Sequence, residues 1–307
     1  MIPSRDEAGN PGFTPHPGGA VFNTAIALGR LRTLTGFVSG LSSDLFGDQL
    51  RAALAGSNVG AGLAITLDRP TTLAFVQLTN GHATYTFYDQ NTAGRSLDPD
   101  RLPDLPDEVT ALYFGGISLI SEPAADFYAN LAVRESANRA IIIDPNIRAG
   151  FINDEETYRA RLDRLFANAD IVKVSDEDLN WIFPGTESMI DKVTALREMG
   201  PQVVILTKGG AGALALAHSG TLIEIASKRV EVVDTVGAGD TFNAGVLAKL
   251  SENGFLAKEA LKEIGDSEIR EAMEYGARVA AMTVSRSGAN PPWAHELTSH
   301  VEKNRNR

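Results

Sequence analysis

The chain has 307 residues, of which 43% are apolar and 22% charged, a composition typical of a globular protein with one large domain or two small ones. A formal net charge of −11 argues against binding to nucleic acid or to an anionic membrane surface. Cysteine is absent, which excludes disulfides, thiolate metal sites and a cysteine nucleophile and fits a cytoplasmic location. No apolar run has transmembrane length, and the N-terminal residues lack the pattern of a signal peptide.

The first ninety residues predict loop, helix and hairpin. Proline, glycine and charge dominate residues 1–17, which predicts a loop. Two β-rich runs then flank Thr79-Asn80-Gly81, and Asn-Gly between such runs is typical of a hairpin turn. The elements predicted here are a helix at Gly19–Leu31, a strand at Thr35–Ser39, a helix at Leu45–Gly56, and hairpin strands at Thr71–Leu78 and Ala83–Tyr88.

The rest of the chain alternates apolar strands with amphipathic helices, which indicates βαβ units and a parallel sheet covered on both faces. We therefore expect a doubly wound, mainly parallel α/β sheet flanked by helices, one domain over residues 1–307, with a small β lid inserted at about residues 68–92. The expected strands are Ala111–Phe114, Ala140–Ile143, Ile171–Val174 and Val203–Thr207, then a β-rich patch at Gly212–Ala217 and Thr221–Val233, and finally helices at Thr241–Ser251 and Ser267–Ser285.

The most specific motif is Asp234–Phe242, which follows a β run and opens a helix. Gly237, Ala238 and Gly239 allow a tight backbone whose N–H groups point at an anion, and the helix N-terminus adds partial positive charge. Beside such an anion hole, the carboxylate of Asp240 can accept a proton from a hydroxyl nucleophile. The alternative is that Asp240 only caps the helix and the glycines only make a turn.

The string Asp-Thr-Val-Gly-Ala-Gly-Asp-Thr-Phe resembles the C-terminal signature of the ribokinase-like, or PfkB, carbohydrate kinases. The resemblance covers nearly the whole chain, because other landmarks of the family follow in order. These are Gly18–Asn23, Gly40–Gly47, Thr207–Gly212 and Arg286–Ala289. It implies a doubly wound fold with a lid, and phosphoryl transfer from Mg-ATP to a primary hydroxyl of a sugar.

The resemblance also implies roles for individual residues. Asp240 is the base, and the amides of Gly237, Ala238 and Gly239 form the anion hole. The sugar hydroxyls contact Gly18, Gly19 and Asn23, and the ATP site is lined by Thr207, Gly209 and Gly212. Without the second signature, these glycines would predict only turns, and Asn23 a solvated helix residue.

Two ion sites follow from the same resemblance. A monovalent cation such as K⁺ is expected behind the anion hole, at Asp234, Val236, Arg286 and Gly288. For Mg²⁺ and phosphate the family has Asn-x-x-Glu, whereas this chain has Ser175-Asp176-Glu177-Asp178. Asp178 keeps a shorter carboxylate, which water-mediated contact with Mg²⁺ tolerates better than direct ligation. Lys173 is expected to supply positive charge to phosphate.

The substrate prediction rests on three strings that resemble fructokinases more than ribokinases or adenosine kinases: Phe87–Ala93, Asp144–Arg148 and Ser287–Trp293. They imply conversion of fructose to fructose 6-phosphate, with a ketodeoxygluconate kinase or another sugar kinase as the alternative. Arg148 is expected either to reach a phosphate or substrate oxygen or to form a salt bridge. A non-catalytic relative that binds sugar or nucleotide is the alternative from another class. Lid hairpins in the family often pair two subunits, so we expect a homodimer.

The start of the chain lacks one family feature. Ribokinase-like kinases usually open with an apolar strand that ends in a sugar-binding aspartate, and here only Met1-Ile2-Pro3 and a polar loop precede Gly18. Asp6 and Glu7 do not match that aspartate. The resemblance therefore predicts a longer natural chain, in which Met1 is internal.

Overall fold

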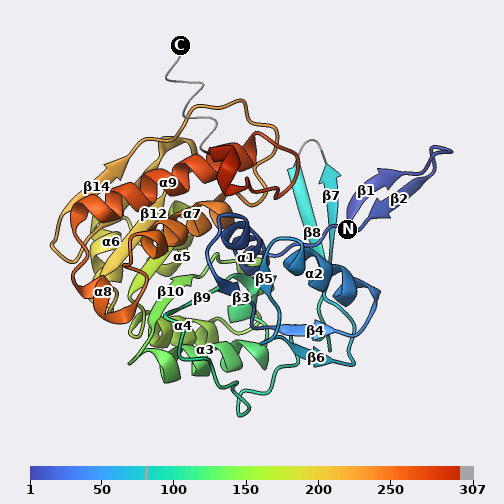
Figure 1. The fold of residues 1–307 in the computed structure, drawn as a ribbon, viewed down its shortest axis with the longest axis horizontal. Coiled ribbons are helices and arrows are strands. Elements are labelled where there is room, and N and C mark those ends of the chain that lie inside the picture. The colour runs from blue at the N-terminus through green and yellow to red at the C-terminus, as the bar shows by residue number, and fades with distance from the viewer. Residues whose placement is uncertain (80–81, 298–307) are drawn as a thin grey trace.

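The structure is a computed structural model that describes residues 1–79 and 82–297 (Figure 1). The predicted Asn80-Gly81 turn lies outside the described residues. Of the described part, no helix is long and apolar enough to cross a membrane.

A six-stranded sheet organises the larger part of the molecule, in the strand order β14-β13-β12-β11-β10-β9. The strands from β9 to β12 are parallel, and β13 and β14 are antiparallel to their neighbours. Their bounds are β9 (Ala111–Gly115), β10 (Ala140–Asp144), β11 (Ile171–Ser175), β12 (Val203–Thr207), β13 (Ala213–Leu216) and β14 (Leu222–Ile225). The predicted mainly parallel sheet is confirmed, but the β-rich patch at 221–233 forms a strand only as far as Ile225.

Helices cover both faces of this sheet because alternate strand residues point to opposite sides. On β12, Val203 and Ile205 join one apolar core and Val204 and Leu206 join the other. The first face is covered by α1 (Ala20–Arg30), α7 (Ala238–Glu252), α8 (Lys258–Lys262) and α9 (Asp266–Val284). The second is covered by α3 (Ala124–Glu135), α4 (Glu155–Phe166), α5 (Asp176–Ile182) and α6 (Met189–Glu198). Three short 3₁₀ turns lie in loops, η1 (Gly116–Leu119), η2 (Ala149–Phe151) and η3 (Gly209–Ala211).

A smaller apolar core lies between α1 and α2 (Leu45–Ala55). Around it, β3 (Thr35–Gly36) pairs with β5 (Val59–Gly60) and β4 (Gly40–Ser42) pairs with β6 (Ile65–Leu67), both in parallel. The strand predicted at Thr35–Ser39 therefore forms only at Thr35–Gly36, and a second strand begins at Gly40. The chain turns the side chain of Phe37 into this core, and at Gly40 it passes so close to Ala93 that a Cβ would lie 2.0 Å from the Ala93 carbonyl oxygen.

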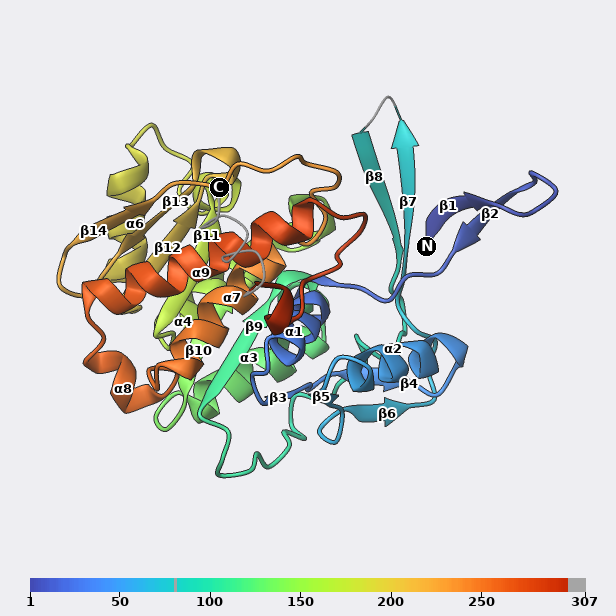
Figure 2. The same ribbon diagram turned by 45° about the horizontal axis from the view of Figure 1, so that its top comes forward.

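The lid is an antiparallel hairpin of β7 (Leu73–Thr79) and β8 (His82–Tyr88), paired from Leu73 with Tyr88 to Thr79 with His82. It stands at the α2 end of the molecule, beside a second ribbon formed by the N-terminal residues (Figures 1 and 2). The loop predicted for residues 1–17 is wrong, because β1 (Ile2–Arg5) and β2 (Pro11–Thr14) pair there as antiparallel strands.

The N-terminal ribbon is held by its turn and by the lid. The Asp6 carboxylate closes the turn by accepting hydrogen bonds from the backbone N–H and the Nδ2 of Asn10, at 2.8 and 2.9 Å. The Met1 amino group donates to the Ala74 carbonyl at 2.9 Å, and Val76 N–H donates to the Met1 carbonyl at 3.1 Å. These strands are mostly exposed, so they lack the alternation of apolar residues that would have predicted them.

Two carboxylates join the base of the lid to the body. Asp44 caps α2 by accepting from Gly47 N–H at 2.8 Å, and it also accepts from the N–H and Oγ1 of Thr71. Asp89, which directly follows β8, accepts hydrogen bonds from the hydroxyls of Thr72 and Ser121. The segment before β7 and the segment after β8 are therefore both attached to the body by hydrogen bonds.

Helices α7 and α9 approach closely at two glycines. A Cβ on Gly276 would lie 2.7 Å from the Phe242 carbonyl oxygen and 2.9 Å from Val246 Cγ2, and a Cβ on Gly245 would lie 2.6 Å from the Cα of Gly276. Because these distances are shorter than normal contacts, only glycine allows this spacing. The contact fixes α7 against the sheet.

We expect Gly276→Ala to lower the free energy of unfolding by about 1–2 kcal/mol. A Cβ this close to backbone atoms should cost about 2–3 kcal/mol, the upper part of the usual range for overpacking, and this outweighs the roughly 1 kcal/mol that alanine gains over glycine in a helix. Denaturant titration measures the change. Gly62→Ala is the matched control, since nothing lies within 4 Å of a Cβ there. Equal stability of the two variants would show that α7 and α9 can separate without cost.

Candidate active site

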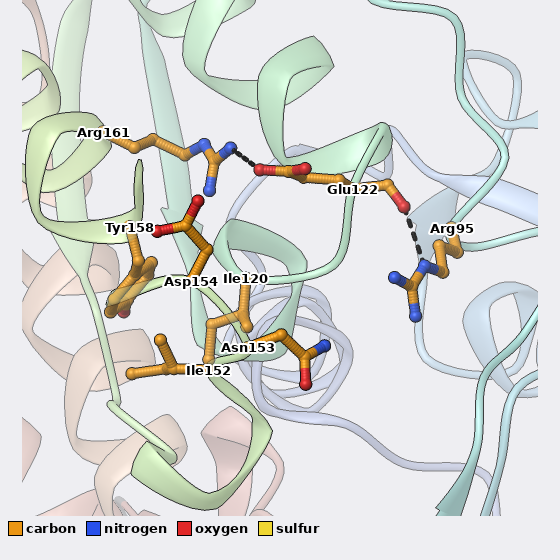
Figure 3. A pocket seen from close by; sticks show the side chains of 8 residues that line it. All are labelled: Arg95, Ile120, Glu122, Ile152, Asn153, Asp154, Tyr158 and Arg161. Carbon is orange, nitrogen blue, oxygen red and sulfur yellow. Dashed lines mark hydrogen bonds and ion pairs between the residues drawn. The ribbon is translucent and has the colours of Figure 1, made fainter. Parts of the chain in front are cut away.

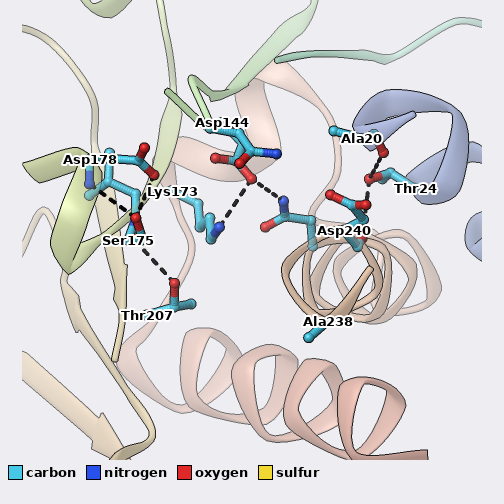
Figure 4. Close-up of polar contacts among 12 residues, drawn as sticks. Ala20, Thr24, Asp144, Lys173, Ser175, Asp178, Thr207, Ala238 and Asp240 are labelled. Atoms are coloured by element: carbon cyan, nitrogen blue, oxygen red, sulfur yellow. Dashed lines mark hydrogen bonds and ion pairs between the residues drawn. The ribbon is translucent and has the colours of Figure 1, made fainter. Parts of the chain in front are cut away.

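The predicted site residues gather at the carboxyl edge of the parallel strands, where open α/β sheets bind ligands. Asp144 ends β10 beside Gly115 of β9, and Ser175 ends β11 beside Thr207 of β12. The N-terminus of α7 faces this edge and brings Asp240 toward Asp144 and Lys173 (Figure 4).

Asp240 is the third residue of α7 and only 8% exposed. Asn23 of α1 donates from Nδ2 to its Oδ2 at 2.8 Å, and Thr24 Oγ1 donates to its carbonyl at 3.1 Å. The second oxygen of the carboxylate is therefore available to a proton donor. The sequence placed Asn23 and Asp240 in one site from separate motifs, and the structure brings them into contact.

The turn before Asp240 is shaped for an anion. Gly237 has φ 77°, and a Cβ there would lie 2.7 Å from the Cβ of Ala289. The amide of Ala238 donates to the Thr235 carbonyl at 3.2 Å. Within the described residues, the amides of Gly239 and Asp240 donate to no carbonyl outside α7, and in a first helical turn they have no partner within it. Among the described residues the amide of Gly237 has no acceptor either, so the geometry favours Gly237, Gly239 and Asp240, rather than Ala238, as donors to an anion.

Burial raises the pKa of Asp240 to about 6, although the hydrogen bond from Asn23 opposes the rise. The carboxylate of Asp144 raises this pKa further, and the cations Lys173 and Arg148 lower it. Asp240 is therefore ionised near neutral pH but basic enough to accept a proton, as a general base requires.

Lys173 lies in the interior, 6% exposed, with its ammonium 3.1 Å from Asp144 Oδ2. The same oxygen accepts from Asn243 Nδ2 at 2.6 Å. Nearby carboxylates raise the pKa of Lys173 against the lowering effect of burial, so this lysine remains charged. Its Nζ lies 3.4 Å from the point that a Cβ on Gly239 would occupy, and thus beside the turn.

The carboxylate of Asp178 is buried and hydrogen-bonded to the protein, so it is not exposed as a direct metal ligand would be. It completes a capping box with Ser175, accepting at Oδ2 from the N–H and Oγ of Ser175, and at Oδ1 from Ile147 N–H at 2.7 Å. It is 5% exposed. In the described residues, no three histidine or acidic side chains group as a metal site.

Of the residues predicted to bind sugar, Gly18, Gly19 and Asn23 lie at the start of α1, and Arg148 lies in the loop after β10. Gly19, with φ 126°, is the N-cap of α1, and a Cβ on Gly18 would lie 3.7 Å from Asn23 Oδ1. Arg148 is exposed and donates only to the Asn146 and Ile147 carbonyls. It makes no ion pair within the part of the chain that the structure describes, which argues against the predicted salt bridge.

The residues predicted to bind ATP follow β12. Thr207 Oγ1 donates to the Val174 carbonyl at 3.3 Å. Gly209 and Gly212 have φ of 51° and 94°, and a Cβ on Gly212 would lie 2.2 Å from the Ile225 carbonyl oxygen. The positive φ at both positions and the close approach at Gly212 therefore require glycine.

Asp234 joins two loops behind the turn. Its carboxylate accepts from Val236 N–H at 3.0 Å and from Gly288 N–H at 2.8 Å. Arg286 instead forms a 2.6 Å ion pair with Glu296. Three of the four residues predicted for a monovalent cation are thus linked by hydrogen bonds.

A separate cavity of about 60 Å³ lies beside the base of the lid (Figure 3). None of the predicted site residues lines it. Arg161, only 6% exposed, crosses one side and is paired with Glu122 at 2.6 Å and Asp126 at 3.0 Å. Asp154 accepts from Thr157 Oγ1 at 2.7 Å, whereas the buried Tyr158 hydroxyl has no hydrogen-bond partner among the described residues.

Sequence reasoning missed the roles of Asn243 and Tyr113. Asn243 donates to both Asp144 Oδ2 and the Tyr113 hydroxyl oxygen, the latter at 2.9 Å. A signal existed for Asn243, because it follows Asp240 by three residues and so lies on the same face of the helix. Tyr113 is in a predicted apolar strand, where nothing marks its hydroxyl.

Comparisons with known proteins identify the family. The model of the pfkB family of carbohydrate kinases matches residues 5–296. A fructokinase of Rhizobium leguminosarum bv. trifolii is 46% identical over 271 residues, which cover 88% of this chain and 82% of that one. A probable chloroplastic fructokinase-6 of Arabidopsis thaliana is 31% identical, over 92% of this chain and 73% of that one.

Solved structures give the same fold. A fructokinase of Xylella fastidiosa with bound ATP superposes with a TM-score of 0.88 at 25% identity, covering 99% of this chain and 95% of that one. An aminoimidazole riboside kinase of Salmonella enterica gives 0.80 at 26% identity, over 98% and 95% of the two chains. Together with the family match and the 46% identity, these findings mean that the chain belongs to the pfkB family of carbohydrate kinases.

Proposed function

We propose that this chain transfers the γ-phosphoryl group of ATP to the primary hydroxyl at carbon 6 of fructose, giving fructose 6-phosphate and ADP. The observation that carries the proposal is the buried Asp240 carboxylate beside the open amides of the α7 turn. Similarity to fructokinases at 46% identity supports the choice of sugar.

The residues divide the reaction between them. Asp240 accepts the proton of the sugar hydroxyl, whose oxygen forms the new bond to the γ-phosphorus while the bond to the β,γ-bridging oxygen breaks and ADP leaves with that electron pair. The amides of Gly239 and Asp240 and the ammonium of Lys173 face the charge of the transferring group. Gly18, Gly19, Asn23 and Arg148 contact the sugar, and Thr207, Gly209 and Gly212 contact the nucleotide.

Two ions are proposed to bind next to these residues. Asp178 would hold the Mg²⁺ of Mg-ATP through water, because both its oxygens already accept hydrogen bonds, and the ion would supply positive charge to the phosphates. Behind the turn, a monovalent cation fits the carbonyls of the residues that Asp234 draws together, Val236 and Gly288. An enzyme that consumes ATP and contains no cysteine is also expected in the cytoplasm.

A coupled assay of ADP release with a panel of sugars tests the proposal. We expect kcat/KM for fructose to exceed that for ribose, aminoimidazole riboside and ketodeoxygluconate by tenfold or more, because buried polar groups that lose a hydroxyl partner reject the analogue. Omitting Mg²⁺ should abolish turnover, and omitting K⁺ should lower it. A preference for another member of the panel would replace the substrate, and no turnover with any would favour a binding protein.

We expect Asp240→Asn to lower kcat by about 10²–10⁴ and at the same time to stabilise the protein at pH 8. A carboxyl whose folded pKa is raised to about 6 contributes stability below its ordinary pKa of 3.8 and loses it as the pH rises through 6. The amide lacks this loss, so the free energy of unfolding should rise by about 2–3 kcal/mol at pH 8 and change little at pH 4. Thermal melts at both pH values measure it. Asp107→Asn, an exposed carboxyl, is the control and should change neither quantity.

We further propose that the lid pairs two copies of the chain. The lid exposes Tyr88 at 61%, and the N-terminal ribbon beside it exposes Phe13 at 51% and Ile2 at 38%. Phe75 of the lid packs edge-on against the rings of Phe13 and Tyr88. Such exposed groups are typical of an interface. Sedimentation equilibrium should give a dimer that Phe13→Ser/Tyr88→Ser converts to monomers. A wild-type monomer at micromolar concentration would contradict this proposal.

A further inference from the structure

A buried charge cluster joins three elements behind the proposed anion hole. Asp144, at the end of β10, is 1% exposed. Its Oδ2 accepts from Lys173 of β11 at 3.1 Å and from Asn243 of α7 at 2.6 Å. Its Oδ1 is also buried, and among the described residues it has no hydrogen-bond donor. A buried carboxylate with one unpartnered oxygen is costly, so a role beyond packing is expected for it.

The cluster determines where the ammonium of Lys173 lies. A lysine side chain has a flexible stem of four carbons, so other groups must fix the position of its ammonium. Asp144 holds this one with its Nζ beside Gly239, in the first turn of α7. The ammonium and the helix N-terminus therefore present positive charge to the same place.

We propose that Asp144 is a positioning residue for phosphoryl transfer, which clamps Lys173 and Asn243 so that the ammonium faces both the anion-hole turn and the base Asp240. The inference rests on the proposed function. Asp144 touches neither the sugar nor the nucleotide in this scheme, and it acts through Lys173.

The charges around Asp240 allow the clamp to be measured. Asp144 from β10, Lys173 from β11 and Arg148 from the loop after β10 all act on it, and Tyr113 of β9 and Asp178 of α5 face the same cluster. Asp144 raises the pKa of Asp240 and Lys173 lowers it. Loss of the Asp144 charge should therefore lower this pKa and loss of the Lys173 charge should raise it, whereas an ion pair remote from Asp240 should not move it.

A second buried pair provides the matched control. Asp170 precedes β11 at the opposite end of the sheet, is 2% exposed, and pairs with Lys258 at 2.9 Å. Loss of one partner from either pair leaves an unpaired charge and lowers stability. The double neutral variants, Asp144→Asn/Lys173→Met and Asp170→Asn/Lys258→Met, avoid that unpaired charge and keep the comparison valid where a single variant fails to fold.

The test measures the Asp240 titration by carbon NMR of the chain labelled at aspartate carboxyls, with the signal identified by its loss in Asp240→Asn. Kinetics with fructose and thermal melts accompany it. We expect Lys173→Met to raise the pKa of Asp240 and Asp144→Asn to lower it. Turnover should fall at least tenfold in both and in their double variant, with KM for fructose changed less than threefold. The Asp170 and Lys258 variants should leave the titration and turnover unchanged.

Two results would overturn the inference. One is an Asp240 titration that does not move in either single variant. The other is a folded Asp144→Asn/Lys173→Met variant with near wild-type turnover. The titration does not depend on turnover, so shifts in the expected directions in a chain that fails to phosphorylate fructose would overturn the proposed function and leave the clamp in place.

Discussion

The hydrogen bonds from α1 to Asp240 are the interaction on which the site depends. Asn23 and Asp240 are 217 residues apart in the sequence, yet they meet at 2.8 Å, and Thr24 adds a bond to the Asp240 backbone. These contacts bring the glycines that precede α1 to the turn that opens α7. The close approach of α7 to α9 at Gly245 and Gly276 then fixes that turn over the strand ends. A shift of either helix would separate the base from the residues proposed to hold its substrate.

The burial that makes Asp240 a better base also lowers the stability of the folded protein. Burial raises the pKa of Asp240, which makes the carboxylate more basic and also costs stability at neutral pH. The cluster at Asp144 carries a similar cost, because one oxygen of a buried carboxylate lacks a donor in the described structure. Asp178 differs, because both oxygens of its carboxylate accept hydrogen bonds, one from the Ile147 amide and the other from Ser175. Its carboxylate is thus explained by its role in the capping box of α5, whereas packing alone does not explain the arrangement at Asp144 and Asp240.

The sequence predicted the parts of the fold that depend on local pattern. Four apolar runs became β9 to β12, since buried parallel strands read as continuous apolar segments. The glycine turn before Asp240 was predicted because its backbone excludes other residues, as the positive φ of Gly237 shows. The ribbon of β1 and β2 was missed because its residues are exposed and do not alternate. The roles of Asn243 and Tyr113 were missed for a different reason. The spacing of Asn243 from Asp240 shows only that the two share a helix face. Its contacts with Asp144 and Tyr113 exist because β9, β10 and α7 meet in space, which no local pattern encodes.

The lid and the site differ in their response to acid, and this separates two functions of carboxylates in the fold. Burial tends to raise the pKa of Asp44, but hydrogen bonds from Thr71 and Gly47 lower it to about 2. The pKa of Asp240 is about 6. As the pH falls, Asp240 becomes protonated while Asp44 remains ionised and still joins α2 to the lid. Acid should therefore stop proton transfer well before it loosens the lid. The two pKa values differ because the numbers of hydrogen-bond donors differ. The carboxylate of Asp44 accepts three hydrogen bonds, which stabilise its charged form. Asp240 accepts one, and a base that must accept a proton from its substrate has to keep the other oxygen unoccupied.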